Sequence, residues 1–350
     1  MSDTLQFLVD ERGTAAQLGA YVVGAAFARG PGTRDSGGPA AFALGDGTVR
    51  LLQPGGEAWQ AVPVHAGAVL ALAAAPGGFV TGGDDGRFCR VGPDGAVQEI
   101  ASLGGRWVEQ VAAHEDPQGK GGLLACAVGK QARVFDARGK PLKQLGHPSS
   151  VAGLAFDAKG KRLGAAHYGG ASLWFVAARE DKPRLLEWKG SHLGIAIHPA
   201  GEAVVTAMQE NALHGWRLAD GQHMRMSGYP AKTESLSFSR SGKWLASGGA
   251  ESVVLWPFFG GGPMGKPPVE LAGGDGVLCT RVAFHPQQDV VAAGFSDGLV
   301  ALADVGSERV LPVAPPGQGA VTALAWSADG ARLAFGTEQG HAAVVDLGKR

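Results

Sequence analysis

The sequence predicts an all-β fold built from repeated short strands, and three observations carry this prediction. Glycine accounts for 57 of the 350 residues, about twice its usual share, while 45% of the residues are hydrophobic. A chain with that much apolar surface is expected to fold, so its glycines belong in tight turns rather than in disorder. Two short motifs also recur along the chain, and no long segment has helical periodicity.

The first recurring motif is a tight turn between two strands. In GFSDGLVALAD (294–304), a Gly/Asp turn leads into alternating apolar residues that end in Asp. Asp-Gly turns tolerate the positive φ angles that short hairpins require. The same pattern occurs in ALGDGTVRLLQ (43–53) and TGGDDGRFCRV (81–91), and looser copies lie at 248–258 and 336–346.

The second motif precedes each hairpin and reads apolar-x-x-apolar-small-aromatic, as in VAGLAFDAKG (151–160) and VTALAWSADG (321–330). The spacing between successive aromatic positions, or the equivalent residues, measures the length of the repeat. That position falls at Phe27, Ala74, Ala113, Phe156, Ile197, Phe238, Phe284 and Trp326. The intervals are 47, 39, 43, 41, 41, 46 and 42 residues, which indicates a repeat architecture.

Each repeat reads as four antiparallel strands, and radial repetition of such units is the β-propeller arrangement. Eight sets of inner strands predict eight blades, with seven as the alternative. The last unit lacks a fourth strand, and TLQFLVD (4–10) has no partner of its own. We therefore expect residues 4–10 to close the last blade as its outer strand, and residues 1–350 to form a single domain.

These repeats resemble the WD40 family. Gly146-His147 and His65 stand where that family places its Gly-His pair, and Asp46, Asp85 and Asp297 match its turn aspartate. The closing Trp-Asp pair is degenerate. Asp136, Asp304 and Asp346 keep only the Asp, whereas Trp174 and Trp256 keep only the Trp. The resemblance covers essentially the whole chain and implies a propeller that binds other proteins, with His65 and His147 in a structural Asp-His network.

Composition excludes several classes of function. With 31 basic and 32 acidic residues, the chain lacks the charge expected of a nucleic-acid binder. No apolar stretch approaches the roughly 20 residues that span a bilayer, and the N-terminus does not read as a secretory signal. Three scattered cysteines form no metal or disulfide framework. We expect a monomeric, cytoplasmic protein, and the Ala, Gly and Val content favours a bacterial source.

The central channel of a propeller is where an enzyme of this architecture would place its site. The third residue of the inner-strand motif should face that channel, and most of these residues are small: Gly24, Ala71, Gln110, Gly153, Gly194, Ser235, Arg281 and Ala323. Such a lining does not favour a metal or another cofactor. A propeller enzyme, or a small-molecule or anion sensor that uses Arg281, is the alternative function.

The loops are the remaining candidates for function. FFGGGPMGKPPVE (258–270) joins the third and fourth strands of its unit and carries Phe258, Phe259 and Met264, which could anchor a partner or, for the Phe pair, lie buried in the strand. The opposite face carries the connections between units, with residue types common in binding hot spots. These residues are Arg106, Trp107, His192, Tyr229 and Lys232. We predict a non-catalytic protein-interaction scaffold that uses one of these loop faces, with Arg281 as a further candidate.

Overall fold

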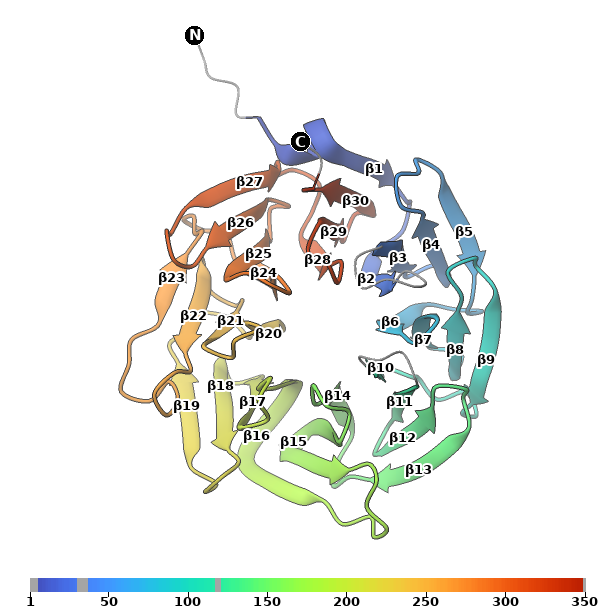
Figure 1. Cartoon of the computed structure of the whole chain (residues 1–350), viewed down its shortest axis with the longest axis vertical. Helices are drawn as coiled ribbons and strands as arrows, with labels where there is room; N and C mark the ends of the chain where they lie inside the picture. Colours follow the sequence, from blue (N-terminus) through green and yellow to red (C-terminus); the bar gives the residue numbers. More distant parts are fainter. Residues whose placement is uncertain (1–5, 30–36, 117–120, 349–350) are drawn as a thin grey trace.

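The computed structural model describes residues 6–29, 37–116 and 121–348. These residues form antiparallel sheets arranged radially around a central opening (Figure 1). The inner strand of each sheet carries the repeated aromatic position, as at Phe27 in β2 and Trp326 in β28. The repeat therefore corresponds to the radial unit, and the all-β propeller prediction is confirmed.

Six of the seven sheets in the described chain have four strands each. The first three, in chain order, are β2 (Val22–Arg29), β3 (Gly37–Leu44), β4 (Thr48–Leu52) and β5 (Trp59–Pro63); β6 (Val69–Ala75), β7 (Gly78–Gly83), β8 (Arg87–Val91) and β9 (Val97–Ser102); and β10 (Gln110–Glu115), β11 (Gly122–Val128), β12 (Gln131–Asp136) and β13 (Pro141–Gly146).

The other three four-stranded sheets lie in the second half of the ring. They are β20 (Leu236–Phe238), β21 (Trp244–Ser247), β22 (Val253–Pro257) and β23 (Val269–Leu271); β24 (Cys279–Phe284), β25 (Val290–Phe295), β26 (Val300–Asp304) and β27 (Val310–Ala314); and β28 (Val321–Trp326), β29 (Arg332–Thr337), β30 (His341–Asp346) and β1 (Gly13–Gln17).

The remaining sheet has six strands, so the described residues form seven sheets and the prediction of eight separate blades is wrong. Its strands are β14 (Val151–Phe156), β15 (Arg162–Phe175), β16 (Arg184–Ile197), β17 (Ala203–Met208), β18 (Ala212–Arg217) and β19 (His223–Ser227).

The difference arises because β15 and β16 each run unbroken for 14 residues. One half of β16 pairs with β15 and the other half pairs with β17. Gly169 (φ 88°) and Gly190 (φ 105°) adopt the left-handed backbone that lets these strands bend without ending. Two sequence repeats, with landmarks at Phe156 and Ile197, are thus joined in one continuous sheet.

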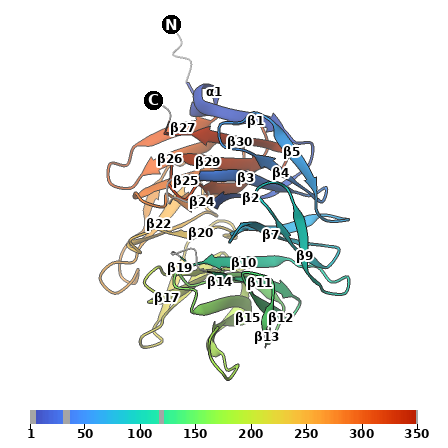
Figure 2. The ribbon, with the colours of Figure 1, turned by 45° about the vertical axis from the view of Figure 1, so that its right-hand side comes forward.

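The chain ends meet in a way that differs from the expectation for residues 4–10. Residues 1–5 lie outside the described part, and Leu8–Arg12 form a single helical turn, α1. The strand that pairs with β30 is β1, from Gly13↔Val345 to Gln17↔His341. Figure 2 shows α1 and β1 along the outer edge of this sheet. Within the described residues this short helix is the only one, and no helix is long enough to cross a membrane.

The core lies between neighbouring sheets rather than inside any one of them. Between the first two sheets, Val49 and Leu51 of β4 pack with Phe79, Cys89 and Val91 of β7 and β8. The same kind of layer joins the last sheet to the first. There, Val22, Phe42 and Leu44 pack with Ala323 and Val344.

Buried histidines and a tyrosine crosslink the strands within individual units. His65 Nδ1 lies 2.9 Å from Asp85 Oδ1, and its Nε2 lies 2.9 Å from Thr81 Oγ1. Burial acts to raise the pKa of Asp85, but amide hydrogen bonds from Ala66 and Arg87 and the contact with His65 outweigh it, so this pKa is lowered. His65 therefore joins the expected Asp-His network.

His147 departs from that expectation because its partners include no aspartate. Trp174 Nε1 donates to His147 Nε2 over 3.1 Å, and His147 Nδ1 lies 3.4 Å from the Lys130 carbonyl oxygen. In another unit, Trp256 Nε1 donates to the Tyr229 hydroxyl over 2.6 Å, and that hydroxyl lies 2.6 Å from Ser247 Oγ. Tyr229 thus takes the position that histidine holds in its counterparts.

Replacing both Ala15 and Ala16 by proline tests the role of β1. One of these two neighbouring amides faces β30 in an antiparallel ladder, and proline cannot donate. We expect the double variant to lower the free energy of unfolding by about 1–3 kcal/mol, as measured by urea denaturation. The matched Ala15→Ser, Ala16→Ser variant keeps both N–H groups and should stay close to the parent. Equal stability of both variants would show that the β1 ladder is dispensable.

The buried histidines predict that acid weakens the fold. Burial, the largest cause, lowers the pKa of His147 from 6.5 to about 4 and that of His214 from 6.5 to about 3. Between these values the unfolded chain binds protons that the folded chain does not, so the free energy of unfolding falls as the pH drops below about 6.5. Each histidine contributes a slope of up to about 1.4 kcal/mol per pH unit.

His214→Gln isolates one of these contributions. We expect the variant to have a smaller slope of unfolding free energy against pH between pH 6 and pH 4. The decrease should correspond to the uptake of roughly one proton fewer on unfolding. Urea denaturation at a series of pH values measures that slope, and its value near neutral pH separately reports any loss of packing. A variant with the parent's slope would contradict the assignment.

Candidate functional site

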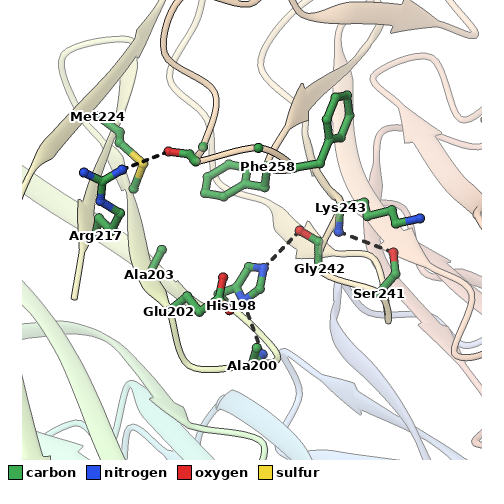
Figure 3. Close-up of a pocket in the computed structure, with 14 residues that line it drawn as sticks. His198, Ala200, Glu202, Ala203, Arg217, Met224, Ser241, Gly242, Lys243 and Phe258 are labelled. Atoms are coloured by element: carbon green, nitrogen blue, oxygen red, sulfur yellow. Dashed lines mark hydrogen bonds between the residues drawn. The ribbon is translucent and has the colours of Figure 1, made fainter. Parts of the chain in front are cut away.

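A cleft of about 280 Å³ opens between the six-stranded sheet and the sheet that follows it. The turn after β16 lines one side of this cleft. In that turn the Ala200 amide donates a hydrogen bond to His198 Nδ1 over 3.2 Å. His198 Nε2 donates to the Gly242 carbonyl oxygen over 3.0 Å, which ties this turn to the equivalent turn of the next unit. Figure 3 shows His198 between these turns, with Arg217 and Met224 on another wall.

His198 and its counterpart His285 are thus structural side chains that cap equivalent turns. His285 Nδ1 accepts from the amides of Gln287 and Gln288, at 3.1 and 3.0 Å, and its Nε2 lies 3.2 Å from the Gly330 carbonyl oxygen. Both ring nitrogens of each histidine are therefore engaged with the backbone. Neither ring has a nitrogen left for proton transfer to a substrate.

The loop after β22 forms the rim of this cleft and contains three predicted partner anchors. Phe258 is buried (9% exposed) and its ring meets Phe238 edge-on, with ring centroids 5.0 Å apart. Phe259 is 45% exposed and Met264 is 49% exposed. Only the last two are thus available to a partner, and Phe258 belongs to the core, which was the alternative expectation.

Lys266 holds this loop in place. Its ammonium group lies 4.7 Å from the centroid of the Phe259 ring and donates to the carbonyl oxygens of Phe259 and, over 2.9 Å, Gly262. Trp244 packs against the other side of the arrangement, with its ring centroid 5.4 Å from that of Phe259. The exposed phenyl ring is therefore held in place by contacts within the chain itself.

The candidates on the opposite face divide into exposed and buried residues. Trp107 is 60% exposed and Arg106 is also exposed. His192 is fully buried, with Nδ1 2.7 Å from Thr206 Oγ1 and Nε2 3.1 Å from the Trp188 carbonyl oxygen, and Tyr229 is 8% exposed. The prediction that His192 and Tyr229 contact a partner is corrected, because both polar groups are already bonded inside the protein.

Lys232 and Arg281 flank one carboxylate near the channel. Lys232 Nζ lies 2.7 Å from Glu234 Oε1, and Arg281 Nη1 lies 3.7 Å from Glu234 Oε2. The hydrogen bond from Lys232 lowers the pKa of Glu234. Arg281 also donates from Nε to the Thr322 carbonyl oxygen (2.7 Å) and from Nη1 to that of Thr280 (2.9 Å). Backbone carbonyl oxygens thus engage Nε and Nη1 of Arg281 and fix the orientation of its side chain.

The channel itself contains a cavity of about 370 Å³. Four of the residues predicted to face the channel line it: Gln110, Gly153, Gly194 and Ser235. Leucine and isoleucine side chains share the wall, at Leu154, Leu193, Ile195 and Leu236. No cluster of three metal-ligating side chains occurs among the described residues.

Sequence reasoning missed the basic side chains that border the cleft and the turns beside it. Lys159, Lys161 and Lys243 come from turns equivalent to the His198 turn. The stretches AKGKR and SGKW could have indicated these lysines, because each places a lysine at the same distance after the repeated aromatic position. Two further long Gly- and Pro-containing segments, 28–40 and 114–122, include residues 30–36 and 117–120, which lie outside the described part of the chain.

Comparisons with known proteins agree with this architecture. Residues 279–349 match the model of the anaphase-promoting complex subunit 4 WD40 domain. Telomerase protein component 1 of Mus musculus is 26% identical over 254 residues, which cover 67% of this chain and 9% of that protein. The periodic tryptophan protein 2 homolog of Schizosaccharomyces pombe is 32% identical over 108 residues, covering 30% of this chain and 12% of that protein.

The chain thus spans about a tenth of the length of these curated relatives. A crystal structure of the computationally designed Ika8 protein superposes with a TM-score of 0.72 at 20% identity, covering 94% of this chain and 96% of that one. This likeness concerns the fold alone. Together with the repeated strands, the turn aspartates and the His65 network, the matches support a β-propeller of the WD40 type.

Proposed function

We propose that this propeller is a non-catalytic platform that binds a partner protein through the face carrying the 258–270 loop. The exposed Phe259 and Met264, on a loop braced by Lys266, carry the proposal. Exposed aromatic and methionine side chains are typical partner anchors. Because the ring has already fixed this loop, binding would require little additional ordering.

Other features support a binding role over chemistry or sensing. The histidines of the cleft are bonded to backbone through both nitrogens, and Arg281 is held by carbonyl oxygens and Glu234. The three cysteines are buried, and burial raises their thiol pKa values, to about 11 for Cys89 and about 12 for Cys126 and Cys279. We place the protein as a monomer in the cytoplasm, acting without nucleic acid, membrane or cofactor.

A pull-down with matched variants tests this proposal. Immobilised parent protein and a Phe259→Ala, Met264→Ala variant are incubated with lysate of the source organism, and bound proteins are quantified by mass spectrometry. We expect the variant to retain its circular dichroism spectrum and to lose about tenfold or more of the captured partner, because two exposed anchors are truncated.

Two controls locate the binding face. Leu311→Ala removes an equally exposed apolar side chain from the outer strand β27 and should leave capture unchanged. Trp107→Ala removes the most exposed aromatic candidate of the opposite face. Loss of the partner with Trp107→Ala, and not with the loop variant, would assign binding to that other face and overturn the proposal.

A further inference from the structure

A second cavity lies beside the cleft, lined by turns equivalent to those of the cleft. This neighbouring cavity, of about 180 Å³, is lined by Lys159, Lys161, Arg162 and Phe175, and Ala200 lines both cavities. We call the surface formed by these two neighbouring cavities, from Phe175 to Phe259, the basic groove. It crosses the turns of three consecutive repeats.

The groove is positively charged although the whole chain has a formal charge of −1. Its lining contains five basic residues, Lys159, Lys161, Arg162, Arg217 and Lys243, and two acidic residues, Asp157 and Glu202. Local excess of one charge raises the concentration of oppositely charged partners near a surface.

Three of these cations have no carboxylate partner in the described chain. Arg162 Nε lies 2.8 Å from Asp157 Oδ2, and Arg217 bonds to Asp220. In contrast, Lys159, Lys161 and Lys243 are exposed, and no carboxylate of the described residues lies within salt-bridge distance of them. These three ammonium groups therefore remain available to a ligand.

Apolar side chains stand at both ends of the groove. Phe175 is 56% exposed at one end, and Phe259 is 45% exposed at the other, with Met264 in the same loop. The turns between them are fixed by side-chain hydrogen bonds to the next repeat, from Arg162 to the Gly201 carbonyl oxygen (3.3 Å) and from His198 to that of Gly242 (3.0 Å). The groove is thus a preformed surface with a cationic middle and apolar ends.

We infer that the basic groove binds an acidic, extended segment of a partner protein, with apolar residues flanking the acidic ones. This inference rests on the proposed function and specifies the partner's chemistry. Carboxylates would meet the three unpaired lysines, and the flanking side chains would pack on Phe175 and Phe259. A nucleic acid fits less well because aromatic rings for base stacking stand only at the ends.

Fluorescence anisotropy with a defined probe tests the inference. The probe is a fluorescein-labelled peptide, Phe-Glu-Asp-Glu-Glu-Asp-Phe, and its counterpart has lysine in place of every acidic residue. We expect only the acidic probe to bind, with an affinity that falls as salt is raised. Lys159→Glu combined with Lys243→Glu should raise its Kd about tenfold or more, and Phe175→Ala should raise it about fivefold.

A double variant with the same change of charge provides the control. Lys130→Glu combined with Lys189→Glu alters two exposed lysines away from the groove, one in the turn between β11 and β12 and one in β16 next to Gly190, and should change the Kd less than about twofold. Absence of acidic-probe binding, an equal effect of both double variants, or tighter binding of a thymidine oligonucleotide of the same length would overturn the inference.

The two proposals can fail separately. If the acidic probe does not bind but the Phe259→Ala, Met264→Ala variant loses its partner, the proposed function stands and the partner's acidic character is refuted. If the probe binds in the groove but the loop variant keeps its partner, the groove is supported and the loop is refuted as the anchor for that partner.

Discussion

The structure depends on one constraint: no repeat can bury its apolar surface alone. Each sheet is short, and its two faces are covered by the sheets before and after it in the ring. Phe79 and Cys89 cover Val49 and Leu51 of the preceding sheet in this way. Repeat architectures share this nearest-neighbour logic, in which stability resides in the interfaces between units. A ring satisfies it for every unit, provided that the last sheet also covers the first.

Polar side chains reinforce the same interfaces on the face that holds the candidate site. Side chains in the turns of one repeat donate to carbonyl oxygens of the next, as His198 does to Gly242 and His285 to Gly330. Arg332 extends the series across the junction of the chain ends by donating to the Gly38 carbonyl oxygen over 2.7 Å. The candidate site is therefore built from the same contacts that hold the ring together. This is why its turns need no further ordering.

The sequence predicted the strands and their repetition well because Gly-Asp turns and period-2 apolar runs are local signals. It predicted less about how adjacent repeats join. Nothing in the 43-residue spacing indicates that β16 continues from one repeat into the next, since a bend at Gly190 reads like any other glycine turn. Closure by residues 13–17 rather than 4–10 was also missed, because both segments alternate weakly.

The residues of the candidate site also divide into those that local sequence patterns predicted correctly and those that they did not. Phe259 and Met264 are exposed as the loop composition suggested, whereas Tyr229 and His192 looked like surface residues and are buried. Their burial depends on partners far along the chain, such as Trp256 and Thr206, that no local pattern reveals. The basic groove was missed for a related reason. Its lysines come from two turns, one with Lys159 and Lys161 and the other with Lys243, and only the ring brings these turns to either side of the His198 turn.

The unbroken strand β16 has a mechanical consequence for this ring. Adjacent sheets elsewhere contact each other mainly through side chains. Local separation of two neighbouring sheets can therefore begin at each of these boundaries. Between the repeats that β16 connects, the strand itself crosses the boundary, with its first half paired to β15 and its second half paired to β17. Relative motion of these two repeats should therefore bend the backbone at Gly190 instead of being taken up by a separate connecting loop.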